Sequence, residues 1–205
     1  KVTKAMEMIA ASKMRRAQGS VMAGRPYSEK IQNVIANLAA QPSEEGDGLH
    51  PLLATRPVSR VQIVHVSPDR GLCGGLHANL NRAVGQFMLG QQAEVSAITV
   101  GRKGRDFMVR YGQDVKAVFI NLGDRPTVAD TAAISRMVID DFTDGVADEV
   151  YLSYAQFVNA TVQRPVIQRL LPVVPSELVA EHRVGYIYEP SSLAVLGSLL
   201  PRFVE

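Results

Sequence analysis

The stretch VQIVHVSPDRGLCGGLHANL, Val61–Leu80, decides the fold of this chain. Its first six residues form an apolar run rich in Val and Ile, which is typical of a buried strand. Pro, Asp and three glycines follow, and a helical pattern begins at Leu76. The stretch therefore predicts a strand, a tight turn and a helix, the opening unit of an α/β domain.

The same alternation continues toward the C-terminus. Further strands are expected at Val95–Val100 and Val115–Ile120. Helices are expected at about residues 76–89, 103–111 and 128–142. Because consecutive parallel strands need a crossover helix between them, this order predicts a Rossmann-like α/β domain with a mainly parallel sheet.

Two later segments break the alternation. Glu149–Val158 and Pro165–Val173 both have strand character, and only the short connection NATVQR lies between them. A connection of this length is too short for a crossover helix, so the two segments are expected to form a terminal antiparallel hairpin. The motif GYIYEP, Gly185–Pro190, then predicts a short strand or extended segment.

Toward the N-terminus, the sequence predicts one long helix that begins with KVTKAMEMIAASKMRRAQ, Lys1–Gln18. One seam of this helix has the alternating spacing of four and three that is typical of a coiled coil. Pro26 is expected to kink the helix without ending it, and QPSEEGDG, Gln41–Gly48, ends it. The seam consists of Ala10, Met14, Ala17, Val21, Gly24, Ser28, Ile31, Ile35 and Leu38. The segment therefore predicts one half of a coiled coil whose partner helix is not encoded in this chain.

These patterns predict four regions. They are a coiled-coil helix at 1–40, a linker at 41–59, an α/β domain at 60–190 and the start of a truncated C-terminal helix at 191–205. Ser191 or Ser192 is the expected N-cap of the last helix.

Composition and charge limit the classes of function. The net charge of the 205 residues is only +2, but residues 1–30 contain seven Lys and Arg against two Glu, a local charge of +5. The single cysteine, Cys73, excludes an internal disulfide and fits a reducing compartment. No apolar run approaches the ~20 residues that a membrane span needs.

The glycine-rich turn of Gly71, Cys73, Gly74 and Gly75 lies where a nucleotide-binding loop would lie. It departs from the dinucleotide fingerprint, because Cys73 replaces the second required glycine and GRKGR follows the second strand in place of an acidic residue. We therefore expect these residues to form a structural strand-to-helix turn.

Other candidate sites are equally weak. Cys73 and His77 could form a thiol–imidazole pair, but no carboxylate is placed to orient it, and the four histidines have no metal-ligand spacing. GRKGRDF, Gly101–Phe107, is a basic turn without interleaved aromatic residues. Asp140–Asp141 and Asp148–Glu149 are expected to be the solvated end of a helix and the loop after it. The sequence therefore predicts no active site, metal or cofactor.

Four segments together resemble the gamma subunit of the F-type rotary, proton-translocating ATP synthase. They are KVTKAMEMIAASKMRRAQ, GRPYSEKI, SPDRGLCGGLHANL and FVNATVQRPVIQRLLP, and the resemblance continues in order to the closing YIYEPSSLAVLGSLLPRFVE. The resemblance implies a non-catalytic rotor protein of the central stalk, which couples proton flow through the c-ring to conformational changes of the catalytic beta subunits. It also implies that the family's extreme N-terminus and long C-terminal helix lie outside Lys1–Glu205.

The resemblance further implies partners and contact residues. The expected partners are the alpha and beta subunits, the epsilon subunit and the c-ring, with no nucleic acid and no bound nucleotide. The shaft residues expected to face beta are Met6, Lys13, Arg15 and Arg16. The residues expected to form the foot that meets the c-ring and epsilon are Tyr186, Tyr188 and Glu189. For a bacterial protein, the expected location is the cytoplasmic face of the plasma membrane, as a peripheral subunit.

Two alternatives from other classes remain open. One is a nucleotide-dependent Rossmann-like enzyme that uses the Gly71–Gly75 turn, which nucleotide titration would detect. The other is a basic module that binds polyanions such as RNA or an acidic membrane through residues 1–30, for which the affinity would fall steeply with salt.

Overall fold

The computed structural model describes residues 2–39, 50–174, 189 and 191–204. The chain divides into two compact units. One comprises Lys1–Asp47 and Pro175–Phe203, and the other comprises Gly48–Val174 with Val204–Glu205. The segment GYIYEP lies outside the described residues, apart from Glu189.

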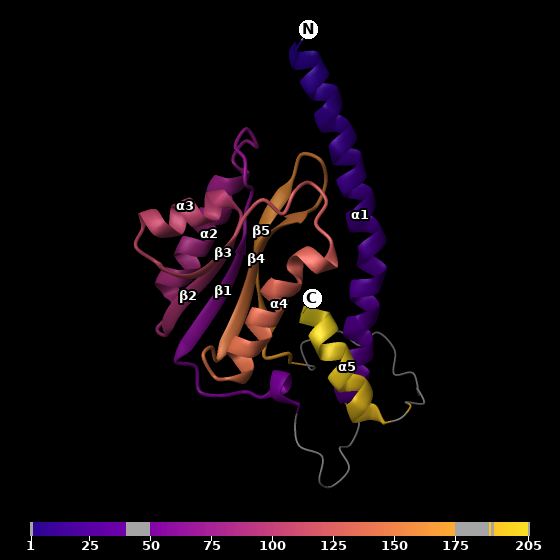
Figure 1. Cartoon of the computed structure of the whole chain (residues 1–205), viewed down its shortest axis with the longest axis vertical. Coiled ribbons are helices and arrows are strands. Elements are labelled where there is room, and N and C mark those ends of the chain that lie inside the picture. Colours follow the sequence, from indigo (N-terminus) through magenta and orange to yellow (C-terminus); the bar gives the residue numbers. More distant parts are fainter. Residues whose placement is uncertain (1, 40–49, 175–188, 190, 205) are drawn as a thin grey trace. The chain divides into compact units, whose positions relative to one another are not determined.

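The second unit is built on a five-stranded sheet in the order β3-β2-β1-β4-β5 (Figure 1). Strands β1 to β4 are parallel to one another, and β5 is antiparallel to β4. This confirms both the mainly parallel sheet and the terminal hairpin. The strands are β1 (Arg60–Val66), β2 (Glu94–Val100), β3 (Asp114–Phe119), β4 (Glu149–Phe157) and β5 (Gln163–Leu171).

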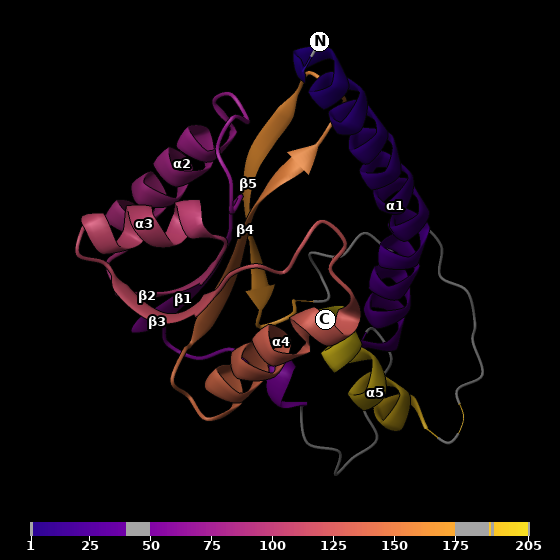
Figure 2. The ribbon, with the colours of Figure 1, turned by 45° about the horizontal axis from the view of Figure 1, so that its top comes forward.

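Three helices cover the two faces of this sheet. They are α2 (Leu76–Gly90), α3 (Arg102–Arg110) and α4 (Val128–Thr143), within a residue or two of the expected ranges. Adjacent helices α2 and α3 share one face (Figure 2). On β1, His65 hydrogen-bonds Asn81 of α2, whereas Gln62 hydrogen-bonds Asp141 of α4. Side chains alternate between the two faces of a sheet along a strand, so residues 62 and 65, which are three apart, point to opposite faces. α4 therefore lies on the face opposite α2 and α3.

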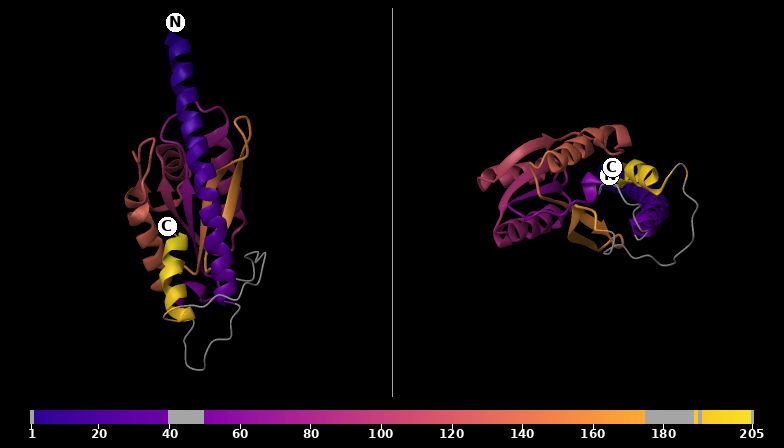
Figure 3. Two further views of the ribbon diagram at one scale, coloured as in Figure 1. Left: turned by 90° about the vertical axis from the view of Figure 1, so that its right-hand side faces the viewer. Right: turned by 90° about the horizontal axis from the view of Figure 1, so that it is seen from below.

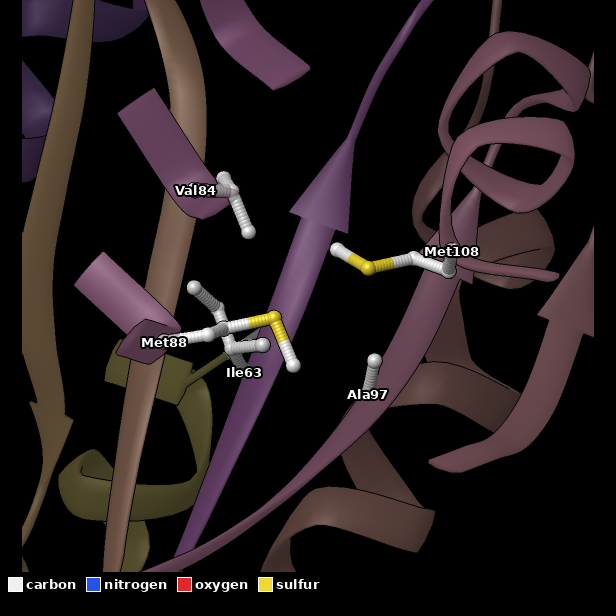
Figure 4. Packing of buried hydrophobic residues seen from close by; sticks show 5 residues of the cluster. All are labelled: Ile63, Val84, Met88, Ala97 and Met108. Atoms are coloured by element: carbon white, nitrogen blue, oxygen red, sulfur yellow. The ribbon is translucent and has the colours of Figure 1, made fainter. Parts of the chain in front are cut away.

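The apolar core on the α2–α3 face is drawn in Figure 4. Ile63 and Ala97 come from adjacent strands at the same register, and Val84 and Met88 reach them from α2. Met108 of α3 completes the cluster, and none of the five side chains is more than 8% exposed. Val84 and Met88 are four residues apart, so they lie on one face of α2 and anchor it to the sheet.

The first unit contains α1 (Val2–Ala39) and α5 (Ser192–Val204). At 38 residues, α1 is about 57 Å long, and it continues through Pro26 as expected. α5 begins at the predicted cap, because the Ala194 N–H donates to the Ser191 hydroxyl at 3.2 Å. The two helices lie side by side near the C-terminal end of α1 in Figures 1, 2 and 3. Buried apolar side chains of this unit are Ile31, Ile35, Ala36 and Leu38 in α1 and Leu196 and Leu200 in α5.

The structure corrects one expectation about the acidic pairs. Asp141 and Asp148 are not solvated; they are only 8% and 4% exposed. Asp141 accepts hydrogen bonds from Gln62 Nε2 at 2.7 Å and from Lys116 Nζ at 2.6 Å. Asp148 accepts from backbone N–H groups at the start of β1. Burial is tolerated because each carboxylate is paired or hydrogen-bonded.

The segment before β1 packs against the α/β unit. The short 3-10 helix η1 (Pro51–Leu53) buries Leu52 and Leu53, and the Leu52 carbonyl accepts from the Val173 N–H at 2.9 Å. The Arg56 guanidinium lies 4.6 Å from the centroid of the Phe142 ring. Residues 50–59, expected as part of a linker, therefore belong to this unit.

Candidate functional site

Residues 3–30 of α1 form an almost continuously exposed helical surface. Every residue in this range is exposed except Gln18, which is half-buried. Large apolar side chains are among the exposed ones, including Met6 at 58% and Met14 at 42%. Burial begins at Ile31, so the heptad seam divides into an exposed N-terminal part and a buried C-terminal part.

The structure places the four expected shaft residues on this exposed part of α1, but not on one face. Met6, Lys13 and Arg16 are seven and three residues apart, which puts them along one stripe of the helix. Arg15 is two residues from Lys13, about 200° around the helix axis. Positive charge therefore extends around α1 and is not confined to one stripe.

The glycine-rich turn joins β1 to α2. Gly74 has a φ of +60°, which explains its glycine, and Gly75 is the N-cap of α2. Leu72 also has a positive φ, +61°, and its side chain is fully exposed. The Cys73 Sγ lies 3.5 Å from His77 Nδ1 and 3.8 Å from the Arg70 carbonyl oxygen. The thiol–imidazole proximity considered from the sequence is therefore present, on the first turn of α2.

Asp69, in the loop after β1, joins that loop to the first turn of α3 and to the loop after β3. Its Oδ1 accepts from the Arg102 N–H at the first turn of α3, at 3.0 Å, and its Oδ2 accepts from the Asn121 N–H at 2.9 Å. The negative carboxylate thus satisfies a helix N-terminus that could otherwise bind phosphate. An open pocket of about 650 Å³ lies beside it, but its chemistry does not favour the nucleotide-dependent alternative.

The basic turn GRKGR has a packing role that sequence reasoning missed. Gly101 has a φ of +97°, and a Cβ there would lie 1.9 Å from the Ser67 carbonyl oxygen. A Cβ at Gly104 would lie 2.6 Å from His65 Cδ2, and the Gly104 N–H donates to Ser67 Oγ at 2.7 Å. These two glycines allow α3 to approach β1 closely. Their spacing of three residues after a predicted strand was the signal in the sequence for this close packing.

A buried polar network at His65 was also missed. The Asn81 amide nitrogen donates to the Lys103 carbonyl at 3.2 Å, so Asn81 Oδ1 faces His65 Nε2, 2.9 Å away. His65 therefore donates from Nε2, and its Nδ1 accepts from the Ser153 hydroxyl at 3.3 Å. Burial lowers the pKa of His65, with the Asn81 hydrogen bond opposing the shift in part, and this favours the neutral form of the imidazole. The network ties β1, β4, α2 and α3 together.

The remaining expected residues form no further site among those described. Glu189 is exposed, and Tyr186 and Tyr188 lie outside the described residues. Within residues 2–39, 50–174, 189 and 191–204, no cluster of three His, Cys, Asp or Glu side chains is arranged to hold a metal ion. None of the helices in that part of the chain is both long and apolar enough to span a membrane.

Comparisons with known proteins agree with this arrangement. A family model described as ATP synthase matches residues 1–205. The ATP synthase gamma chain of Dehalococcoides mccartyi is 59% identical over 205 residues, and that of a Roseiflexus species is 48% identical over 208. The alignments cover all of this chain and 72% and 71% of the two relatives. The fold matches a central-stalk chain of the Tetrahymena thermophila mitochondrial ATP synthase, with a TM-score of 0.72, 25% identity and coverage of 100% and 88%.

A long helix joined to an α/β unit is the fold of a central-stalk subunit, as the match to the Tetrahymena chain shows. The chain belongs to the ATP synthase gamma chain family. Members of this family are non-catalytic subunits of a rotary complex associated with the membrane, and the catalytic sites of that complex lie on its beta subunits.

Proposed function

We propose that the exposed part of α1, residues 3–30, is the shaft surface that turns against the catalytic subunits. The observation that carries this proposal is the combination of exposure and charge. Large apolar side chains and six of the chain's cations occur together along 28 residues of continuous helix. In this arrangement the apolar seam packs on a second long helix, and the cations face the alpha and beta subunits.

Weak electrostatics suit a surface that must move past its neighbours. Exposed ion pairs typically stabilise a contact by less than about 1 kcal/mol, so no single pair would hold the rotor at one angle. Cations on the rotor would instead provide a diffuse attraction to carboxylates on the stator. Met6, Lys13, Arg15 and Arg16 are assigned to this surface.

We also assign the residues of the central stalk that face the c-ring. Tyr186, Tyr188 and Glu189 are assigned to a foot that meets the c-ring and the epsilon subunit, at the cytoplasmic face of the plasma membrane in a bacterium. The name of the Tetrahymena structure, which pairs the central stalk with the c-ring, supports a contact of this kind.

Charge reversal in the assembled ATP synthase tests the shaft assignment. A variant with Lys13→Glu, Arg15→Glu and Arg16→Glu should lower coupled ATP synthesis about three- to tenfold, as expected when several weak attractions become repulsions. The control is Arg136→Glu, at an exposed position of α4. Unchanged synthesis in the triple variant, at normal assembly, would contradict the proposal.

A further inference from the structure

A groove of about 730 Å³ is lined by residues of α2, of α3 and of the turn that follows α3. The helices come close at its floor, where a Cβ on Gly85 would lie 3.3 Å from Phe107 Cζ. Gly85 and Phe107 both line the groove at this point, so its floor is largely apolar. Residues that line it include Ala78, Arg82, Gly85, Leu89, Phe107 and Tyr111.

The walls of the groove are two helical ridges. On α2, Ala78, Arg82 and Leu89 are four and seven residues apart, so they follow one side of the helix. The other wall is formed by Phe107 of α3 and by Tyr111, the C-cap of that helix. The rings of Phe107 and Tyr111 are in contact, tilted by 49° with their centroids 4.8 Å apart. Leu89 is 86% exposed and Tyr111 is 63% exposed, although both are large and adjoin an apolar floor. Ridges of side chains such as these are the kind of surface onto which another helix packs.

Among the residues that line the groove, Arg82 is the only Lys, Arg, Asp or Glu, and it is exposed. α2 has no Asp or Glu at all. Two cations of α3 are engaged away from the groove, Arg102 with Asn121 at 2.8 Å and Arg105 with Asp106 at 2.6 Å. The charge that the groove itself presents is therefore positive.

We propose that the α2–α3 groove binds an acidic amphipathic helix of a partner protein. The apolar face of that helix fills the space between Leu89 and Tyr111, and a carboxylate beside that face meets Arg82. The length of α2, 15 residues or about 22 Å, fits a partner helix of about four turns. A bilayer surface fits less well, because the apolar side chains flank a concave floor and do not form a flat, protruding patch.

A synthetic peptide tests this proposal. The probe is a fluorescein-labelled 15-residue peptide with Leu at positions 3, 7, 10 and 14 and Glu and Ala elsewhere. The comparison peptide has Lys in place of each Glu. In fluorescence anisotropy titrations with the chain, the acidic peptide should bind at least tenfold more tightly than the Lys peptide, and rising salt should reduce the difference.

Variants then locate the binding site. Leu89→Glu and Arg82→Glu should each weaken binding of the acidic peptide tenfold or more. Val109→Glu is the matched control, because Val109 is on α3 and 63% exposed but does not line the groove; it should change affinity less than twofold. Circular dichroism melting checks that each variant is folded. Equal binding of the two peptides would overturn the proposal. The proposal would also be overturned if Lys13→Glu lost peptide binding and Leu89→Glu kept it, because the binding site would then be on α1.

Two further measurements separate a protein partner from a membrane. Vesicles of 70% phosphatidylcholine and 30% phosphatidylglycerol should bind wild type and Leu89→Glu equally. If Leu89→Glu lost vesicle binding and the acidic peptide did not bind the wild-type chain, the groove would be a lipid site and the proposal would be overturned.

In the assembled ATP synthase, a photoreactive amino acid at position 89 should cross-link to an acidic helical segment. A cross-link to a basic segment, or the absence of any cross-link, would contradict the proposal.

Discussion

The carboxylate of Asp148 accepts a 2.9 Å hydrogen bond from the backbone N–H of Arg60, which joins the residue before β4 to the first residue of β1. The Ser59 N–H donates to the same oxygen at 3.0 Å, and the Asp148 N–H donates back to the Arg60 carbonyl at 2.8 Å. These bonds fix where the two central parallel strands start relative to each other.

Asp148→Asn should therefore lower the free energy of unfolding by about 1–3 kcal/mol, since an amide leaves part of a buried bonding pattern unsatisfied. Asp144→Asn, at an exposed position a few residues away, should change it by less than about 0.5 kcal/mol. Urea denaturation at pH 7 measures both values. If the two substitutions lowered the free energy of unfolding equally, the hydrogen bonds of Asp148 would not have the stabilising role assigned to them.

The same contact predicts a pH dependence. The hydrogen bond from Ser59 is the main cause that lowers the pKa of Asp148, with burial opposing it and Arg60 and Arg56 adding to it. A lowered folded-state pKa gives stability that is fully present above the unfolded-state value, about 3.9 for Asp. That stability is lost as pH falls below this value and through the folded-state pKa. The stability of Asp148→Asn should consequently fall less steeply than that of wild type over this range in acid denaturation.

The two glycines near the start of α3 give a second prediction. Gly104→Ala should destabilise the chain by at least about 2 kcal/mol, because its Cβ would clash with His65 and Ser67. Gly90→Ala, at the end of α2, has no heavy atom within 4 Å of the added Cβ and should be neutral or slightly stabilising. Thermal melting compares the two. A Gly104→Ala variant as stable as Gly90→Ala would refute the close approach of α3 to β1.

Cys73 is expected to have a structural role only. Cys73→Ser and Cys73→Ala should leave assembly and coupled ATP turnover within about twofold of wild type, because the hydrogen-bond partners of the Cys73 thiol are His77 and the Arg70 carbonyl and include no carboxylate. His77→Ala is the companion variant and should behave in the same way. Loss of turnover in an assembled Cys73→Ser complex would show that the thiol has a chemical role.

The two halves of α1 should differ in hydrogen exchange. Ile35 and Leu38 are buried, and burying such side chains contributes about 1.5–3 kcal/mol each, so amides in this half should be protected. Isolated helices are marginal without packing. Residues 3–20 have exposed side chains apart from the half-buried Gln18, and their cations repel one another. Their amides should exchange fast in dilute solution and gain protection only if dimers form at higher concentration. Strong protection from the N-terminus in a dilute monomer would show that α1 needs no partner helix.

The sequence was sufficient to predict the main helices and strands and the mainly parallel sheet with its terminal hairpin, because apolar runs and connection lengths determine these locally. The coiled-coil seam was equally visible as a spacing. The order of the strands and the short helix η1 were not predicted. The buried polar contacts were not predicted either, since Gln62 and Asp141 are far apart in sequence and Asp141 looks like an ordinary acidic residue at a helix end. The role of Asp69 also depends on loops that meet only after folding. Sequence reasoning therefore predicted the architecture, and missed the polar side chains that join its strands and loops.

A reversible cross-link in the assembled ATP synthase tests the central claim, that the exposed part of α1 turns against the beta subunits. Cys73 is first replaced by Ser, and one cysteine is then introduced by Arg16→Cys, with another on the facing surface of beta. Oxidation should join the two subunits and stop ATP hydrolysis, and reduction should restore it. An oxidised complex that is fully cross-linked and still hydrolyses ATP at the reduced rate would contradict the claim.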